Sequence, residues 1–438
     1  MTTEILERAL ERLPRVDYAD YRLVQTRQLR VAFRHDSSEV AEDAATSVIC
    51  RVVDGGYGVA STSDIGGMQV QRVGELALRQ ARLTQGQVQL APVRPEVGQA
   101  STSERQAFDV DGALALLARL RDTLSQKLSA LDARVEIVIT HYDVDSTLLS
   151  TEGTRVQEMT PLTDLVIYLV VKGVKEGFAS RVVGGRGGLE VLASRDWDEI
   201  LTDLVARALH SANAQVFSPL LRGRRFKVIL DNDAAGAFAH EVAHLLEAGR
   251  FQPRFFEGLR LADELELEDN PLVPGAYGSF MWDDEGVRGA PKTLLKQEGI
   301  RLLHTRLTVG GREQPGNAHG LTHVPTPSMS NVYFRAADWG LSEMFQETKE
   351  GIYARGLVRA EIDTSDGRIE LEPELAYYVD RQGKATPMRH VKIIDDVRRV
   401  LQSVDAIGKR SALRPNLEKG FFIAEGGPHV RLNGARCA

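Results

Sequence analysis

The stretch FKVILDNDAAGAFAHEVAHLLEAG, residues 226–249, joins a short apolar run to an alanine-rich segment through an Asp-Asn-Asp cluster. The run FKVIL is typical of a buried strand, and side chains such as those of the cluster cap helix N-termini. Alanine and leucine favour the helical conformation, and Gly249 can end it. The stretch therefore predicts a strand followed by a helix that extends toward Gly249.

Strand-like patterns dominate the sequence after this helix. Glycine and proline recur every few residues, and the segments 368–380, 390–404 and 429–434 alternate with a period of two residues. That period is typical of strands. We therefore predict a β-rich C-terminal domain, residues 216–438, that carries one functional helix.

The first half of the sequence mixes strands with helices. Alternating, turn-punctuated segments predict strands at 22–34, 46–55, 56–64, 134–153 and 162–183, and apolar spacing predicts helices at 68–84, 110–131 and 196–213. The glycine cluster at 184–188 lacks the Lys-Ser/Thr pair of a phosphate-binding loop and predicts a loose turn. The expected fold class is α+β, with residues 1–215 forming an N-terminal domain of antiparallel sheet and helices.

Size, charge and cysteine content exclude several classes of protein. A chain of 438 residues exceeds the size of about 250–300 residues at which a single core stops growing, so two domains are expected. The net charge of −7 and the lack of a concentrated basic block argue against nucleic-acid binding. Two cysteines suit a reducing compartment. The N-terminus lacks the apolar core of a signal peptide, and no apolar run approaches the roughly 20 residues that cross a bilayer. We expect a cytoplasmic protein.

The sequence HEVAH, residues 240–244, has the spacing of a zinc site. On a helix His240 and His244 lie on the same face, one turn apart, so both rings can bind one ion. Glu241 points to the neighbouring face, where it can take a proton from a water molecule that zinc has acidified. The alternative is that both histidines are ordinary helix residues and the glutamate is solvated.

Zinc needs a third protein ligand, and spacing alone does not identify one. The possible donors are Glu247, His319, His323, His429 and Cys437.

An acidic trio, Asp283, Asp284 and Glu285, could also hold a metal or perform acid–base chemistry. Because Gly286 follows it directly, a solvated turn is the preferred interpretation.

Several segments, in order, resemble the TldD/PmbA family of zinc metallopeptidases, and its TldD-like branch in particular. They are VDYADYRLVQ (16–25), HEVAHLLEA (240–248), MWDDEGVRG (281–289), HVPTPSMSN (323–331) and EGIYARG (350–356). The resemblance implies that His240 and His244 bind Zn²⁺ and that Glu241 is the general base. It also implies a peptidase that acts on unfolded or leader peptides inside the cavity of a dimer, whose second subunit is a relative without the zinc motif. His323 is expected to line that cavity and contact substrate.

The sequence departs from the family pattern in two places that concern the metal. Its second histidine stands one residue closer to the glutamate than the family motif has it. The third ligand of the family is a cysteine in a C-terminal segment, but the comparable residues here, 413–430, contain no cysteine. The third ligand is therefore unassigned, and two alternatives stay open: a metalloenzyme that acts on a small peptide-like metabolite, and a non-catalytic subunit of a heterodimer. Retention of HExxH argues against the latter.

Overall fold

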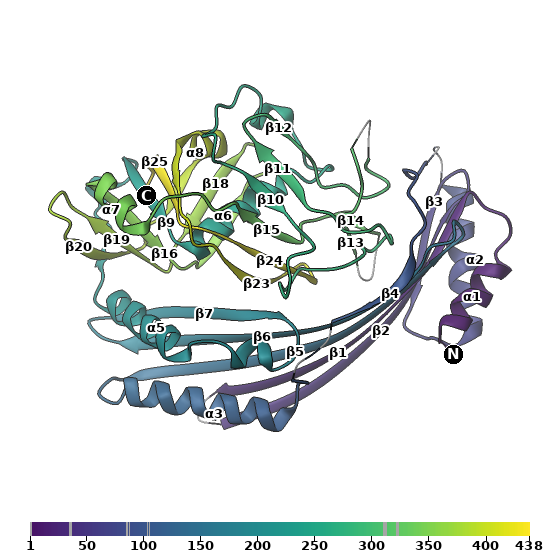
Figure 1. Ribbon diagram of the computed structural model, residues 1–438, viewed down its shortest axis with the longest axis horizontal. Helices are drawn as coiled ribbons and strands as arrows, with labels where there is room; N and C mark the ends of the chain where they lie inside the picture. Colours follow the sequence, from purple (N-terminus) through teal and green to yellow (C-terminus); the bar gives the residue numbers. More distant parts are fainter. Residues whose placement is uncertain are drawn as a thin grey trace.

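The N-terminal half is built on one long, curved sheet of seven strands (Figure 1). The computed structural model of the protein describes residues 2–34, 37–84, 86, 88–102, 104, 106–309, 313–320 and 324–438. Strand order is β3-β2-β1-β5-β6-β4, and β7 also pairs with β6; all neighbours are antiparallel except β4 and β6. The strands are β1 (Tyr18–Arg34), β2 (Ser37–Val53), β3 (Tyr57–Thr62), β4 (Val97–Ser101), β5 (Ala133–Ser150), β6 (Arg155–Lys172) and β7 (Glu176–Arg186).

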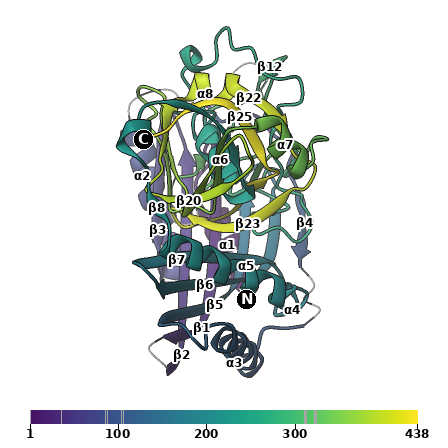
Figure 2. The ribbon, with the colours of Figure 1, turned by 90° about the vertical axis from the view of Figure 1, so that its left-hand side faces the viewer.

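Helices cover one face of this sheet. They are α1 (Thr2–Arg12), α2 (Gly67–Leu83), α3 (Val110–Lys127), α4 (Glu190–Ala193) and α5 (Trp197–Ala212). Ala19 and Tyr21 of β1 pack with α1 and α2, and Val31 and Phe33 pack with α3 and α5. These four positions are all odd-numbered, so they share one face of the strand. The other face, which carries Arg22, meets the C-terminal half (Figures 1 and 2).

The C-terminal half contains short strands arranged around one central helix, α6 (Asn232–His244). A sheet in the order β12-β11-β10-β15-β24-β23 and another in the order β22-β25-β9-β16-β19-β20-β8 form most of it, with the smaller sheets β17-β18-β21 and β13-β14. The elements are β8 (Gln215–Val216), η1 (Pro219–Leu221), β9 (Arg225–Leu230), η2 (Pro253–Phe255), β10 (Leu267–Asp269), β11 (Lys292–Lys296), β12 (Gly299–Ile300), β13 (Ala318–His319), β14 (Thr326–Pro327), β15 (Asn331–Phe334), α7 (Leu341–Thr348), β16 (Gly351–Arg355), β17 (Arg359–Ile362), β18 (Arg368–Glu372), β19 (Leu375–Val379), β20 (Ala385–Arg389), β21 (Ile393–Asp396), α8 (Val397–Ser403), β22 (Val404–Ile407), β23 (Ala412–Glu418), β24 (Phe421–Gly427) and β25 (Val430–Arg436). The predicted α+β class is confirmed. None of the helices in the described part of the chain is both long and apolar enough to cross a membrane.

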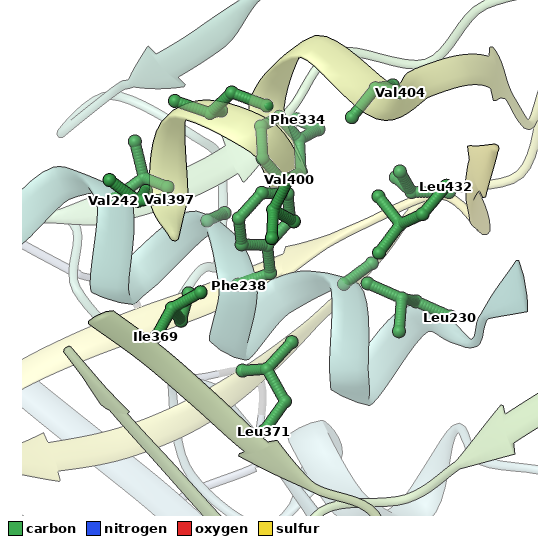
Figure 3. Packing of buried hydrophobic residues seen from close by; sticks show 14 of the residues in the cluster. Leu230, Phe238, Val242, Phe334, Ile369, Leu371, Val397, Val400, Val404 and Leu432 are labelled. Carbon is green, nitrogen blue, oxygen red and sulfur yellow. The ribbon is translucent and has the colours of Figure 1, made fainter. Parts of the chain in front are cut away.

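The core of the C-terminal half anchors one face of α6. Phe238 and Val242, one turn apart, point into a cluster that includes Phe334 of β15 and Val400 of α8 (Figure 3). A residue two positions from Phe238 is turned by about 200° around the helix axis. His240 therefore lies on the side of α6 that faces away from this cluster.

A contact between two glycines brings the hairpin of β23 and β24 close to that side of the helix. A Cβ atom on Gly236 of α6 would lie 2.6 Å from the Cα of Gly426 in β24, which no side chain could tolerate. The strand that contains Gly426 also contains Glu425, so the contact brings a carboxylate next to the first histidine.

Helix α6 ends earlier than the sequence predicts. Its last helical residue is His244 rather than a residue near Gly249. The chain leaves the helix because it pairs with another segment: the Leu303 amide donates to the Leu246 carbonyl at 2.9 Å, and Ala248 donates to the Leu303 carbonyl at 3.1 Å. Tertiary pairing thus overrides the helical preference of the leucines and places Glu247 just past the helix end.

Two further predictions about secondary structure were wrong in part. Residues 390–404, predicted to be a strand from their alternation, contain α8, in which Asp396 accepts the amides of Arg398 and Arg399. The glycine cluster 184–188 is not a loose turn, because its first residues belong to β7. A Cβ atom on Gly185 would lie 2.7 Å from the Gly275 carbonyl oxygen, so the cluster permits close backbone packing.

The acidic trio, expected to be a solvated turn, is largely buried between the two halves. Asp284 pairs with Arg22 at 2.9 Å, and Glu285 pairs with Arg51 at 2.7 Å. Asp283 accepts the backbone amides of three residues of its own half, and burial raises its pKa to about 7. The prediction of solvent exposure was wrong because the N-terminal sheet supplies the matching guanidinium groups. The trio therefore joins the halves of the molecule.

We expect Asp231→Ala to lower the free energy of unfolding by about 2 kcal/mol, the upper end of the range for helix caps. Asp231 caps α6 by accepting the Ala234 amide at 2.9 Å, and its other oxygen accepts the Gly356 amide at 2.8 Å. Alanine would leave both donors without this partner. Denaturant titration followed by circular dichroism measures the change.

The control is Asp196→Ala at the start of α5. Asp196 is an exposed cap that accepts one backbone amide, so its loss should cost about 1 kcal/mol. Equal losses in the two variants would contradict this account of Asp231.

Candidate metal centre

The two histidines of α6 point their rings at a common position. The Nε2 atoms of His240 and His244 lie 3.0 Å apart, and both side chains are buried. Zinc binds imidazole nitrogen at about 2.0–2.1 Å, so two nitrogens less than about 4 Å apart can share one ion. The structure thus brings together the pair that the sequence spacing predicts.

A carboxylate lies behind each ring. The Glu425 Oε2 atom is 2.7 Å from His240 Nδ1, and the Glu247 Oε1 atom is 2.7 Å from His244 Nδ1. Because a carboxylate only accepts hydrogen bonds, these two neighbours favour a proton on Nδ1 and a lone pair on Nε2 in each neutral ring. Two lone pairs 3.0 Å apart repel each other unless a cation lies between them. The donor set therefore fits a metal ion, and the carboxylates orient the rings as such partners do in zinc proteins.

Arginines hold both carboxylates in place. Glu425 is paired with Arg414 and also accepts the Asn416 amide at 3.3 Å, while Glu247 pairs with Arg250 at 3.2 Å. Burial raises the pKa of Glu425, but Arg414 and His240 outweigh this effect and keep its pKa well below the ordinary value.

The Glu425 carboxylate also shifts the pKa of His240, the first histidine of the pair. Burial lowers the pKa of His240, but the Glu425 carboxylate outweighs burial and leaves the pKa above its ordinary value. The position between the rings therefore favours positive charge, whether a proton or a metal ion supplies it.

Glu241 is buried beside the histidine pair. Burial raises its pKa above the ordinary value of a glutamate, although the neighbouring charges of His240 and His244 act in the opposite direction. A carboxylate with a raised pKa is a stronger base than an exposed one, which is a property required of a general base near neutral pH. The solvated glutamate of the alternative interpretation is not what the structure contains.

A third donor approaches the open side of the histidine pair. Glu418, the last residue of β23, places Oε1 3.8 Å from His244 Nε2, and ligand atoms of these three residues all lie within 4.8 Å of one another. Burial raises the pKa of Glu418, but Lys419 and the two histidines outweigh it, so the pKa lies below the ordinary value. Glu418 is not among the donors that the sequence predicts.

A cavity opens beside Glu247 and Glu418, the two carboxylates nearest to His244. Its volume is about 380 Å³, and it is lined by Glu247, Gly249, Arg250, Thr326, Pro327, Ser328, Glu418, Lys419 and Phe421. Its size is within the range of sites that bind small ligands, about 300–1,000 Å³.

The other residues that the sequence offers as ligands lie in environments different from that of the histidine pair. The ring of His319 lies between Phe280 and Phe421, with ring centroids 5.4 and 5.6 Å away. His429 Nε2 is 3.2 Å from the hydroxyl of Tyr353, and Cys437 is buried in the hydrophobic core. His323, the predicted substrate contact, lies outside the described residues.

Two family models match the chain. Residues 223–438 match the PmbA/TldA metallopeptidase C-terminal domain, and residues 104–216 match the central domain. The chain belongs to the PmbA/TldD family of metallopeptidases. The resemblance inferred from the sequence is thus confirmed, and the histidine pair lies within the C-terminal domain of the family.

Named relatives support this assignment. A metalloprotease of Methanothermobacter thermautotrophicus is 28% identical over an alignment of 449 residues that covers 96% of this chain and 95% of the relative. A protein named zinc metalloprotease TldD homolog from Saccharolobus solfataricus is 25% identical over an alignment of 252 residues that covers 54% of this chain and 56% of that protein. The crystal structure of TldE from Thermococcus kodakarensis superposes with a TM-score of 0.82 over 100% of both chains at 15% identity, which shows the shared PmbA/TldD fold.

Proposed function

We propose that the protein is a zinc-dependent peptidase in which His240 and His244 bind the metal ion and Glu241 is the general base. The observation that carries the proposal is the pair of Nε2 atoms 3.0 Å apart, each on a ring whose other nitrogen faces a carboxylate. Membership of a metallopeptidase family supports it, as does a relative named as a zinc metalloprotease.

Zinc bound between the rings supplies a Lewis acid that polarises the peptide carbonyl and acidifies the attacking water. Glu241 follows His240 directly, so it lies beside the histidine pair, about 100° around the helix. From there its carboxylate takes the proton of the water as that oxygen attacks the carbonyl carbon, and then donates it to the departing amine. Glu247 and Glu425 keep both histidine rings in the orientation that binding requires.

We propose unfolded or leader peptides as the substrate class. His240 and His244 are only 5% and 7% exposed, so a folded domain cannot bring its backbone to them, whereas an extended chain can enter the adjoining cavity. We further propose that the protein works as a dimer with a related subunit, by analogy with its family. The fold it shares with TldE is in keeping with this arrangement.

The experiment is a hydrolysis assay on three substrates: an unfolded peptide, the same sequence within a folded domain, and small amides. It is run with the protein alone and with a co-expressed relative, with and without a chelator, and light scattering gives the oligomeric state. We expect chelator-sensitive cleavage of the unfolded peptide only, by a dimer. Cleavage of small amides alone would favour an enzyme of peptide-like metabolites. Metal binding without any cleavage would favour a non-catalytic subunit, and either result would contradict the proposal.

A further inference from the structure

We propose that Glu418 is the third protein ligand of the metal ion, so that two histidines and a carboxylate hold it. The inference rests on the proposed function, because it concerns the same ion, but it assigns a ligand that the sequence motif leaves open. It also identifies a metal site whose donor atoms are all nitrogen and oxygen.

The position of Glu418 relative to the histidines distinguishes it from the other carboxylates nearby. Glu247 and Glu425 both face Nδ1 atoms, behind the rings, so neither can reach the position that the two Nε2 atoms share. Glu418 approaches from the Nε2 side, with Oε1 3.8 Å from His244 Nε2. Among the described residues it is the one that completes a three-donor group with this pair.

The hairpin of β23 and β24 fixes Glu418 where a ligand is needed. Glu418 pairs with Phe421 across a turn of two residues, Lys419 and Gly420, whose φ angles are 51° and 87°. Such a turn, with positive φ at both positions, keeps the strand ends in strict register. A lysine is an unusual residue for this conformation, which asparagine, aspartate and glycine prefer. The tight turn therefore holds Glu418 at the end of its strand.

One face of the same hairpin supplies two groups to the site. Glu425 is paired across the strands with Arg414, and Glu418 lies four residues beyond Arg414 in β23. Residues an even number apart share a face, and so do directly paired residues, so Glu418 and Glu425 are on the same side. That side covers the histidines of α6. A single rigid element thus orients the His240 ring and presents the third donor. It is also the segment in which the family resemblance leads one to expect a cysteine.

The charges around Glu418 suit reversible binding of a metal ion. The Lys419 ammonium lies 2.7 Å from Glu418 Oε1, the oxygen nearest to His244. This ion pair satisfies the half-buried carboxylate when no metal is bound, and the lysine side chain is exposed enough to move into water when the carboxylate turns to the ion. Two histidines and a glutamate form a known ligand set of catalytic zinc, which leaves a position for water or substrate.

The test is zinc affinity, measured by competition with a chelator for purified protein and variants whose fold is checked by circular dichroism. We expect Glu418→Gln to weaken zinc binding more than about 100-fold, beyond the 10- to 100-fold typical of losing a partner behind a ligand. Glu247→Gln, which changes such a partner, should fall within that range. Glu418→His, which restores a donor, should bind nearly as tightly as the wild type. Leu417→Ala, on the other face of β23 and half exposed, should not change affinity.

A second readout is the absorption spectrum of the cobalt-substituted wild type, which should lack a thiolate-to-cobalt charge-transfer band. Unchanged zinc affinity in Glu418→Gln, an equal loss in Glu418→Gln and Glu418→His, or a thiolate band in the wild type would overturn the assignment of Glu418. A different result would contradict the proposed function itself: the wild type would bind no zinc, or His240→Ala and His244→Ala would bind it as tightly as the wild type.

Discussion

Glu241→Gln is expected to lower peptide turnover by about 100- to 10,000-fold, the usual contribution of a general base, and to leave the metal content unchanged. Glutamine has the size and hydrogen-bonding reach of glutamate but cannot accept the proton. Glu241 is buried next to the two histidines rather than solvated, and in the proposed mechanism its carboxylate acts on a water molecule there. Removing a negative charge that burial disfavours should not unfold the protein.

Rate and metal content measured on the same preparation distinguish three roles of Glu241. A slow enzyme with full metal content is the result expected of a general base. A slow enzyme that has also lost its metal would make Glu241 a ligand. Full activity with full metal content would contradict the peptidase mechanism.

His240→Ala and His244→Ala are expected to abolish metal binding at micromolar zinc and, with it, all turnover. Each substitution removes one of two nitrogens that face each other at 3.0 Å, and the remaining donors cannot replace it because the nearby Glu247 and Glu425 lie behind the rings. Elemental analysis of dialysed protein gives the metal content per chain.

The control is His210→Ala, on the exposed side of α5, where the ring bonds the hydroxyl of Tyr377 at 2.7 Å. That variant should keep one metal ion per chain. Equal metal content in all four proteins would rule out the histidine pair as the site.

The local part of the site could be predicted from sequence because it depends on neighbours in the chain. The strand before Asp231, the cap itself and the four-residue spacing of the histidines all act within one helical segment, and the structure reproduces them. The family resemblance predicted a TldD/PmbA-type metallopeptidase, and the matches to the two domain models of that family confirm it.

The distant part of the site could not be predicted in this way. Glu418 and Glu425 reach the helix only because the register of β23 and β24 and the contact of Gly236 with Gly426 bring the hairpin there. One glutamate among many carries no local signal of such a position. Residues 413–430 correspond to the segment that holds the family cysteine, but they contain no cysteine, and Glu418 is the residue that we propose there as the ligand.

Burial between the two halves also escaped prediction. Asp284 and Glu285 have the composition of an exposed turn, and their neutralisation depends on Arg22 and Arg51, which belong to the N-terminal sheet. Similarly, the alternation in residues 390–404 fits a strand as well as it fits α8. Asp396 caps the N-terminus of α8 by accepting two backbone amides, and this favours the helix.

The most direct test of the account is anomalous diffraction at the zinc absorption edge from crystals of the protein as purified. We predict one strong anomalous peak per chain, within bonding distance of the Nε2 atoms of both His240 and His244. A map without a peak there, in crystals that show the two nitrogens still about 3.0 Å apart, would mean that a shared proton and not a metal ion joins the rings. That result would contradict the proposal that this protein is a metal-dependent peptidase.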